Sequence, residues 1–376
     1  MVMIKCSIGF NQQKQLVRSH SFDLKIISEI QNINYKTFYR WVRDEFCEIS
    51  SPKVQQELHG HDTPSSSGSG KPYMVEVPIF RPECVGESMA IDEKSVGNEV
   101  YTVFTNSKTG NIALMCSSLE ASNICLIMSR FGEAVLGRVK SVTRDFSATY
   151  EAVATRMLPS AMQTVDKFHT VKELMSDLQS FRIELKNKEL KRYKKERTAH
   201  KKAYLEDQKL LRSKQTVKKV YHPQTLQNGE TTVELLNRSK YLLYKRPEEW
   251  AFHQSRRAKL LFETFPELLL PYQQAVAFRN WYRGQVNDLR DFKEYRLKEW
   301  IDDVMATKKS PLSAFADTIE SNWDYVLNYF IGHNTNAIAE STNAKIQMAA
   351  IKNRGARDID FFFFRLAHFL NPVTSL

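Results

Sequence analysis

The spacing of apolar positions changes along the chain and divides it into segments of different kinds. In residues 21–46, isoleucine and aromatic positions recur at helical spacing on both sides of a short turn at residues 32–34. Ser21 and Asn34 stand where helix N-caps are expected, because their side chains can accept a backbone N–H in the first turn. Two successive short helices are therefore predicted.

These two helices have the pattern of a helix-turn-helix, and residues 1–50 are interpreted as a small DNA-binding region. A generic helical hairpin has the same pattern, so the sequence leaves both interpretations open. In the first interpretation the second helix exposes aromatic and cationic side chains to a DNA groove, namely Tyr35, Lys36, Tyr39, Arg40 and Arg43.

Residues 51–72 are rich in Ser, Gly and Pro and poor in apolar residues, which is typical of a flexible linker. Beyond the linker, five short apolar runs alternate with two helical patterns, at residues 120–136 and 148–157. This order predicts a mixed α/β layer rather than a helix bundle. The expected strands are Met89–Asp92, Glu99–Asn106, Asn111–Cys116, Gly137–Thr143 and Ala161–Val165.

Residues 170–333 have an almost wholly helical pattern, and residues 336–351 form one further predicted helix. A run of four phenylalanines follows Asp360, and its simplest interpretation is a terminal helix buried against the sheet. The helical region contains a strongly basic run, since residues 182–219 hold fifteen Lys/Arg and five Asp/Glu.

The formal net charge of the chain is +11, and nearly all of it comes from this basic run. Charge concentrated in this way favours a polyanionic partner, and a solvated helical arm that only keeps the protein soluble is the alternative. No segment approaches the roughly 20 apolar residues that span a bilayer, so no membrane partner is expected. The five cysteines include no CxxC pair, and the start of the sequence lacks a secretion signal, which predicts a reducing, cytoplasmic environment.

Two aspartates, Asp92 and Asp145, are predicted at the ends of separate strands. Side chains at neighbouring strand ends converge, and paired carboxylates repel each other unless a proton or a cation neutralises them. With oxygen ligands and no nearby thiols, the expected cation is Mg²⁺ or Mn²⁺. Two such ions can support phosphodiester displacement, but a third acid from a helix is then needed to complete the site.

The sequence around these acids resembles DDE insertion-sequence transposases of the ISL-three-like family over roughly residues 80–370. The matching segments are Ile91-Asp92-Glu93 with Tyr101-Thr-Val103, Val142-Thr-Arg-Asp145-Phe-Ser-Ala-Thr-Tyr150, Pro159-Ser-Ala161, Val165-Asp166-Lys-Phe-His169, Asn334-Thr-Asn-Ala-Ile-Ala-Glu340-Ser-Thr-Asn-Ala-Lys345, Arg354-Gly355-Ala-Arg357 and Phe361–Arg365.

The resemblance implies an α/β RNase H-like catalytic core, with a mixed five-stranded sheet flanked by helices, formed by residues 73–169 and 334–376. A large all-helical insertion, residues 170–333, would interrupt this core. The implied catalytic and metal-binding residues are Asp92, Asp145 and Glu340, which would hold two Mg²⁺ or Mn²⁺ ions. The implied activity is that of a transposase, which binds the inverted repeats of its element, cleaves DNA and transfers the strand to a target.

Asp166 and His169 are open cases: either could act beside the site, Asp166 as a ligand or a structural acid and His169 as an orienting group or an ordinary helix residue. Helical spacing puts Asn336, Asn343 and Gln347 on the same face as Glu340, where amides could contact DNA or metal-bound water. The cations at the end of this segment are candidate phosphate contacts, and ordinary surface cations are the alternative; they are Lys345, Lys352, Arg354 and Arg357.

Many members of the family carry a cysteine zinc ribbon before the helix-turn-helix, and this sequence has no such pattern. A separate small accessory protein, or a longer start of the chain, would then supply that module. The expected partners are double-stranded DNA and further copies of the chain, as a homodimer or larger assembly at the nucleoid. Two other functions use the same features: a non-catalytic DNA-binding regulator, and an RNase H-like nuclease without strand transfer.

Overall fold

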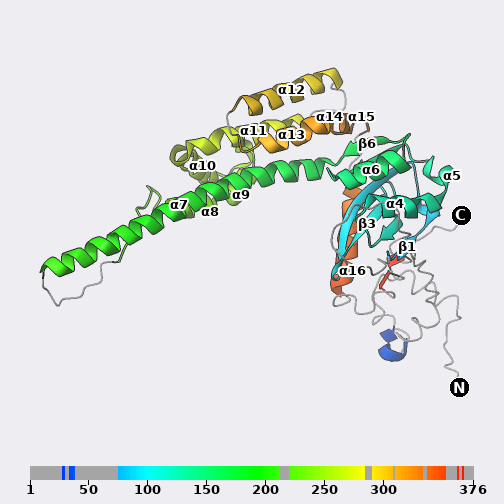
Figure 1. The fold of residues 1–376 in the computed structure, drawn as a ribbon, viewed down its shortest axis with the longest axis horizontal. Coiled ribbons are helices and arrows are strands. Elements are labelled where there is room, and N and C mark those ends of the chain that lie inside the picture. The colour runs from blue at the N-terminus through cyan, green and yellow to red at the C-terminus, as the bar shows by residue number, and fades with distance from the viewer. Residues whose placement is uncertain are drawn as a thin grey trace, which may run out of the picture. The chain divides into compact units, whose positions relative to one another are not determined.

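The computed structural model describes residues 28–29, 34–38, 75–211, 220–283, 290–307, 310–332, 337–352, 362–363 and 366–367 (Figure 1). The chain divides into two compact units. We call Met1–Asp166 together with Asp324–Leu376 the sheet unit, and Lys167–Trp323 the helical unit. In the described ranges, no helix is long and apolar enough to cross a membrane.

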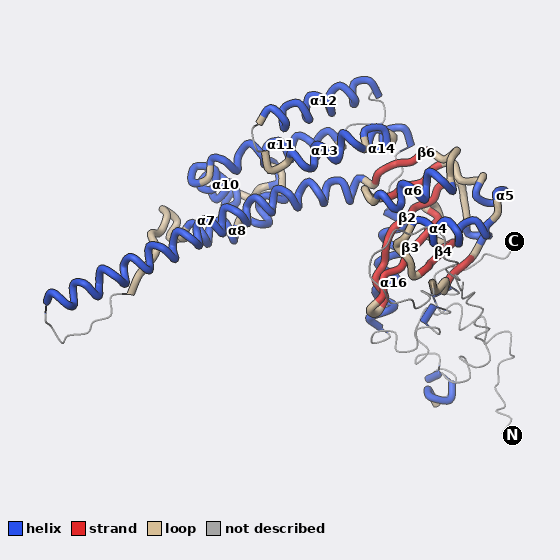
Figure 2. The backbone as a smooth tube through the Cα atoms, in the orientation of Figure 1, coloured by secondary structure: helices blue, strands red, loops and turns tan. Residues whose placement is uncertain are grey.

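The sheet unit contains one mixed sheet with the strand order β1-β4-β3-β2-β5-β6 (Figure 2). Strands β1 to β4 are joined by antiparallel pairs, whereas β2 with β5 and β5 with β6 are parallel. The sheet has six strands and not the expected five, because a two-residue strand, too short for an apolar pattern, pairs with its edge. The strands are β1 Ile79–Phe80, β2 Ser88–Val96, β3 Glu99–Asn106, β4 Ile112–Cys116, β5 Ser141–Arg144 and β6 Met162–Val165.

The turn between β3 and β4 is formed by local hydrogen bonds. The Asn106 side-chain oxygen accepts the backbone N–H groups of Lys108 and Thr109, at 2.9 and 3.2 Å. Gly110 closes the turn with a φ of 76°, a conformation that favours glycine. A Cβ atom at Gly110 would lie 2.9 Å from Thr342 Oγ1, so this glycine also allows close approach of the C-terminal helix.

One face of the sheet is covered by two helices, α4 (Ala121–Met128) and α6 (Ala148–Met157). Ile124 of α4 and Val153 of α6 belong to the same buried cluster as Ile91 of β2, and all three are at most 1% exposed. Burial of this apolar surface holds the two helices on this face of the sheet.

The opposite face is covered by α16 (Ala337–Lys352) and by Phe362 and Phe363. Ile346 of α16 is fully buried against side chains of β3, and the rings of Tyr101 and Phe363 lie 5.1 Å apart. The expectation that the phenylalanine run packs on the sheet is therefore confirmed at these two positions.

Three expected boundaries are wrong. Strand β2 continues past Asp92 to Val96, so Asp92 lies within the strand and not at its end. The helix expected over residues 120–136 is broken into α4, a 3₁₀ turn η2 (Ser129–Phe131) and α5 (Glu133–Leu136), because Gly132 has a φ of 79°. Strand β5 begins at Ser141 and not at Gly137, since the N–H of Val139 still bonds to the carbonyl of Leu136 in the turn that ends α5.

The helical unit is organised around α7 (Lys167–Leu211), a helix of 45 residues (Figure 1). Its aromatic core centres on Phe278, whose ring lies 4.7 Å from that of Trp300 and 5.2 Å from that of Phe315. The other helices of this unit are α8 Thr232–Arg238, α9 Lys240–Tyr244, α10 Phe252–Thr264, α11 Leu269–Trp281, α12 Arg290–Ala306 and α13 Ser313–Ser321. Helices α14 Trp323–Leu327 and α15 Tyr329–Gly332 follow and, apart from Trp323, belong to the sheet unit.

Candidate active site

Asp92 lies within β2, on the sheet face that α16 covers. Its Cα pairs with that of Val103, a member of the buried cluster on the α16 side. One carboxylate oxygen accepts the backbone N–H of Glu93 at 2.8 Å, and the other accepts the side-chain amide of Asn343 at 2.6 Å. Asp92 is therefore oriented by its own strand and by a side chain from the C-terminal helix.

Asp145 follows β5 directly and lies level with Asp92. The last paired residues of β2 and β5 are Ala90 and Thr143, and each aspartate stands two residues beyond its member of that pair. Because side chains alternate along a strand, both aspartates are on the same sheet face as Ala90 and Thr143. The N–H of Ser147 donates to Asp145 Oδ1 at 2.9 Å, which ties the carboxylate to the start of α6.

Asp166 occupies the corresponding position after β6. Arg144 pairs with Val165, and the N–H of Asp166 donates to the Arg144 carbonyl at 2.8 Å, so the register places Asp166 level with Asp145. Its side chain is only 2% exposed. Burial raises the pKa of Tyr329, and the negative charge of Asp166 raises it further. Three aspartates thus occupy one level on three neighbouring strands.

Helix α16 runs along β2 and carries the predicted glutamate. Asn343 contacts Asp92, and one turn later the Gln347 oxygen lies 3.5 Å from Lys94 Nζ. Glu340 precedes Asn343 by three positions, which places it on the same side of the helix one turn earlier. The helix is fixed from its other side, where the Thr342 hydroxyl donates to the Gly110 carbonyl at 3.0 Å.

Asp92, Asp145 and Glu340 are not gathered into a common metal-binding cluster. In the part of the chain that the structure describes, no three His, Cys, Asp or Glu side chains form such a group. The direct contact to Asp92 comes instead from the Asn343 amide. The side-chain contact between α16 and Asp92 of β2 is therefore made by the Asn343 amide, one helical turn after Glu340.

The donor atoms around the aspartates suit a hard cation. Asn343 Oδ1 is buried and has no hydrogen-bond partner among the described residues, and the same holds for the hydroxyls of Thr143 and Thr164. Thr143 and Thr164 pair with each other across β5 and β6, and each lies two residues before Asp145 or Asp166, on the same face of the sheet. Carboxylate, amide and hydroxyl oxygens are the ligands that Mg²⁺ and Mn²⁺ prefer, so the residues present fit such an ion.

Arg144 is a buried residue of this region that the sequence analysis missed. It is fully buried, and its guanidinium donates to the Asp145 carbonyl at 2.9 Å and to Gln163 at 3.1 Å. It also lies 3.3 Å from the Glu151 carboxylate and 4.6 Å from the centre of the Tyr325 ring. Burial lowers the pKa of Arg144, and the nearby negative charge of Glu151 opposes that shift. The sequence signal was weak, because Arg144 ends a strand that already contains Ser141 and Thr143.

The remaining predicted residues are spread over the chain. Asn34 caps a helical turn at residues 34–38, since the N–H of Lys36 donates to Asn34 Oδ1 at 3.0 Å, and Lys36 is exposed. Lys345 is exposed on α16, Lys352 lies at the end of that helix, and His169 belongs to α7 of the helical unit. The predicted residues that fall outside the described ranges are Tyr39, Arg40, Arg43, Asn336, Arg354 and Arg357, together with the linker at residues 51–72.

Comparison with known families agrees with these features. A family model for transposases of the DDE class, ISL3 type, matches residues 89–228 and 220–366. No curated protein and no solved structure matches the chain. The matched residues include Asp92 and Asp145, all of the helical unit and all of α16. The chain belongs to the ISL3 family of DDE transposases.

Proposed function

We propose that the protein binds the ends of its insertion element, cleaves a phosphodiester bond there and joins the freed 3′-hydroxyl to target DNA. The observation that carries this proposal is the level placement of Asp92 and Asp145 on neighbouring parallel strands beneath the helix that bears Glu340. Membership of a transposase family supports DNA as the substrate.

In this proposal the catalytic residues are Asp92, Asp145 and Glu340, and they hold two Mg²⁺ or Mn²⁺ ions. Such ions, when bound, activate the attacking hydroxyl group and stabilise the leaving oxygen. The backbone N–H groups of Glu93 and Ser147 orient the two aspartates toward this task. Loss of either orienting contact would weaken the site without removing a carboxylate.

Asn343 positions Asp92 and keeps α16, the helix that bears Glu340, against β2. Asp166 and His169 stay candidates for supporting roles, as does Asn336. Arg144 holds the backbone carbonyl of Asp145, so it acts through that residue and not on the DNA itself.

DNA contacts outside the catalytic residues are proposed for two sets of cations. Lys36, Arg40 and Arg43 belong to the helix-turn-helix interpretation of the N-terminal region. The other set follows Glu340 and consists of Lys345, Lys352, Arg354 and Arg357. Assembly as a homodimer or larger complex on DNA, a separate accessory protein and location at the nucleoid of the cytoplasm complete the proposal.

The test uses end-labelled DNA that carries the element's terminal repeat, a target plasmid and Mg²⁺. The substitutions Asp92→Asn, Asp145→Asn and Glu340→Gln should each lower strand cleavage by at least about 100-fold, more than the loss of an outer-shell partner does. DNA binding should persist in all three proteins, because no DNA-contacting cation is changed.

Glu93→Gln is the matched control, because Glu93 is an exposed carboxylate next to Asp92. It should cleave at the native rate. Full cleavage by the Glu340→Gln protein would contradict the assignment of the third acid. Cleavage without a joined product would identify a nuclease, and binding without any cleavage by the native chain would identify a DNA-binding regulator.

A further inference from the structure

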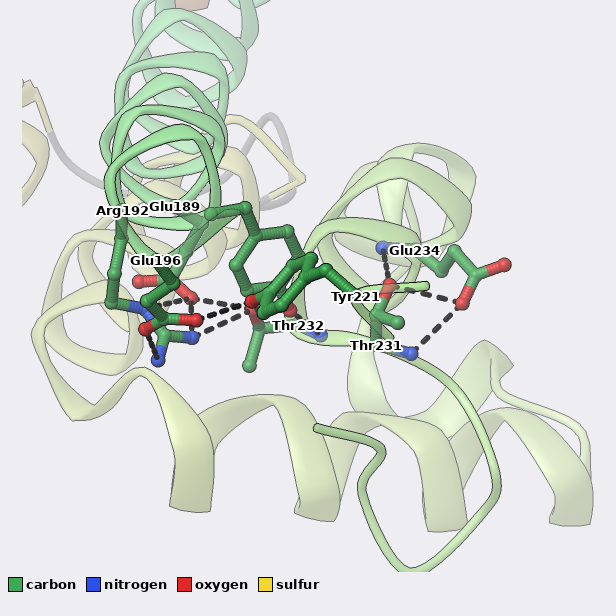
Figure 3. Close-up of polar contacts among 8 residues, drawn as sticks. Glu189, Arg192, Glu196, Tyr221, Thr231, Thr232 and Glu234 are labelled. Carbon is green, nitrogen blue, oxygen red and sulfur yellow. Dashed lines mark hydrogen bonds and ion pairs between the residues drawn. The ribbon is translucent and has the colours of Figure 1, made fainter. Parts of the chain in front are cut away.

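Two acidic side chains of α7, Glu189 and Glu196, face the rest of the helical unit (Figure 3). Glu189 accepts hydrogen bonds from Arg192 and from the Thr232 hydroxyl, both at 2.5 Å. The Glu196 carboxylate lies 3.2 Å from the Arg192 guanidinium and accepts a hydrogen bond from the Tyr221 hydroxyl. Glu189 and Glu196 therefore attach Thr232 and Tyr221, respectively, to α7.

Tyr193 belongs to the same inner side of the helix. Its hydroxyl lies 2.7 Å from Thr232 Oγ1 and accepts the Thr232 backbone N–H at 3.1 Å. Thr231 and Glu234 form a capping box that starts α8 at this point (Figure 3). The hydrogen bond to Glu196 raises the pKa of Tyr221 to about 12, so the phenol stays a donor at neutral pH.

The opposite side of α7 carries lysines that have no such partners. We define the lysine face as Lys191, Lys194, Lys195, Lys201 and Lys202, all of them exposed. Spacings of four and eleven residues align Lys191, Lys195 and Lys202 along the helix, and Lys194 and Lys201 form the adjacent row. Among described residues, none of the five takes part in an ion pair, although the neighbouring Lys188 pairs with Glu184 at 2.9 Å.

The composition of this face decides which partner it fits. Protein interfaces are depleted in lysine and have an apolar centre, whereas Lys191, Lys195, Thr198 and Lys202 form a line with no apolar side chain. The face extends over about 16 Å, because each helical residue rises 1.5 Å. A DNA strand presents a phosphate about every 3.4 Å along the duplex axis, so several phosphates lie within that length.

We propose that the lysine face of α7 binds the phosphate backbone of duplex DNA without reading its sequence. This inference deepens the proposed function and rests on it in naming DNA as the polyanion. Glu189 and Glu196 of the same helix face inward and are engaged there, and the exposed Glu184 pairs with Lys188, so none of these three acids pairs with the lysine face. Binding of this kind releases counterions and depends steeply on salt.

The test measures binding of the full chain to a short duplex of arbitrary sequence, over a series of salt concentrations, with EDTA present so that no cleavage occurs. The variant combines Lys191→Gln, Lys194→Gln and Lys195→Gln. Its affinity at low salt should fall by about 10-fold or more, and the slope of log affinity against log salt should become shallower by about 2–3, since each lost phosphate contact removes roughly 0.9.

Two further triple variants make the result interpretable. Lys240→Gln, Lys259→Gln and Lys298→Gln remove the same charge from exposed positions elsewhere on the helical unit and should bind as the native chain does. Arginine at the three positions of the lysine-face variant should restore affinity and slope. Circular dichroism of each protein checks that the helical content is unchanged.

Unchanged affinity and slope in the glutamine variant of the lysine face would overturn the proposal. An equal loss in the control triple would also overturn it, since only total charge would then matter. Retained DNA affinity together with lost self-association would overturn it in favour of a contact between copies of the chain. Cleavage by the native chain is scored separately, so absent cleavage with lysine-dependent binding contradicts the proposed function alone.

Discussion

Asn343 connects the C-terminal helix to the first aspartate through one short hydrogen bond. Its amide donates to Asp92 at 2.6 Å, and its own oxygen is buried with no hydrogen-bond partner among the described residues. An unpaired buried oxygen costs free energy, and a further partner at this position would offset that cost. The amide oxygen next to Asp92 is therefore a candidate contact for the ion or for an attacking water.

Replacing Asn343 with Ala should weaken catalysis more than folding. Loss of a group that orients a metal-binding carboxylate costs about 10–100-fold in metal affinity or activity. We expect cleavage to fall within that range and the Mg²⁺ concentration for half-maximal cleavage to rise. The measurement is the cleavage rate over a series of Mg²⁺ concentrations.

Gln347→Ala is the control for this prediction, because Gln347 is exposed, one turn further along α16 and only 3.5 Å from Lys94 Nζ. It should leave both quantities unchanged. An Asn343→Ala protein with native Mg²⁺ dependence would show that the contact to Asp92 is structural only.

The carboxylate of Glu189 gives α7 a pH-dependent attachment to α8. Burial acts to raise the pKa of Glu189, but hydrogen bonds from Arg192 and Thr232 outweigh it and lower the pKa below its ordinary value of 4.5. Since the folded-state pKa is depressed, the stabilisation is fully present above the unfolded-state value. It is lost as the pH falls through the folded-state value.

Glu189→Gln should therefore speed amide hydrogen exchange in α8 at neutral pH, by a factor that corresponds to about 1 kcal/mol. The difference between the native chain and the variant should shrink on acidification below pH about 4. Glu184→Gln, on the same helix but with a side chain that is 58% exposed, is the control and should change neither. A difference that persists undiminished in acid would contradict the role of the ionised carboxylate.

Elements with a strong local pattern were predictable, and elements defined by tertiary packing were not. The sequence predicted β3 and α6 with the bounds that the structure has, because alternation and helical spacing are complete within each. It did not predict β1, whose two residues form a strand only by pairing with the edge of β4. It also predicted one continuous helix over residues 120–136, whereas the positive φ of Gly132 breaks that helix. A single glycine within an apolar pattern does not reveal which conformation it adopts.

The candidate site shows the same division. Asp92 and Asp145 could be placed on separate strands from their positions after apolar runs. That the two aspartates lie at the same level of the sheet could not be predicted, because β2 and β5 are neighbours in the sheet although β3 and β4 lie between them in the sequence. The contact of Asn343 with Asp92 and the burial of Arg144 depend on side-chain geometry, which a single sequence does not contain.

At the scale of the whole molecule, the sheet unit is assembled from two parts of the chain that the helical unit separates in sequence. Ile346 of α16 joins the two parts, since it is fully buried in a cluster with Val103 and Met115. Ile346→Asp places a charge in this apolar contact and should lower the free energy of unfolding of the sheet unit by about 3 kcal/mol or more. Denaturant unfolding and the loss of DNA cleavage measure the effect.

Met348→Asp is the matched control, because Met348 lies two positions further along the same helix and is 57% exposed. It should unfold and cleave as the native chain does. Equal destabilisation by both substitutions would mean that α16 does not depend on this contact for its docking.

The contact between Asn343 and Asp92 joins residues 251 positions apart, and this has a consequence for the chain during its synthesis. A ribosome that adds about 5–20 residues per second completes the strand with Asp92 roughly 10–50 s before it reaches Asn343. Throughout that interval the growing chain lacks α16 and, on the proposed assignment, its third acid. On that assignment the nascent chain becomes competent for DNA cleavage only after its final helix has been made and has docked on the sheet.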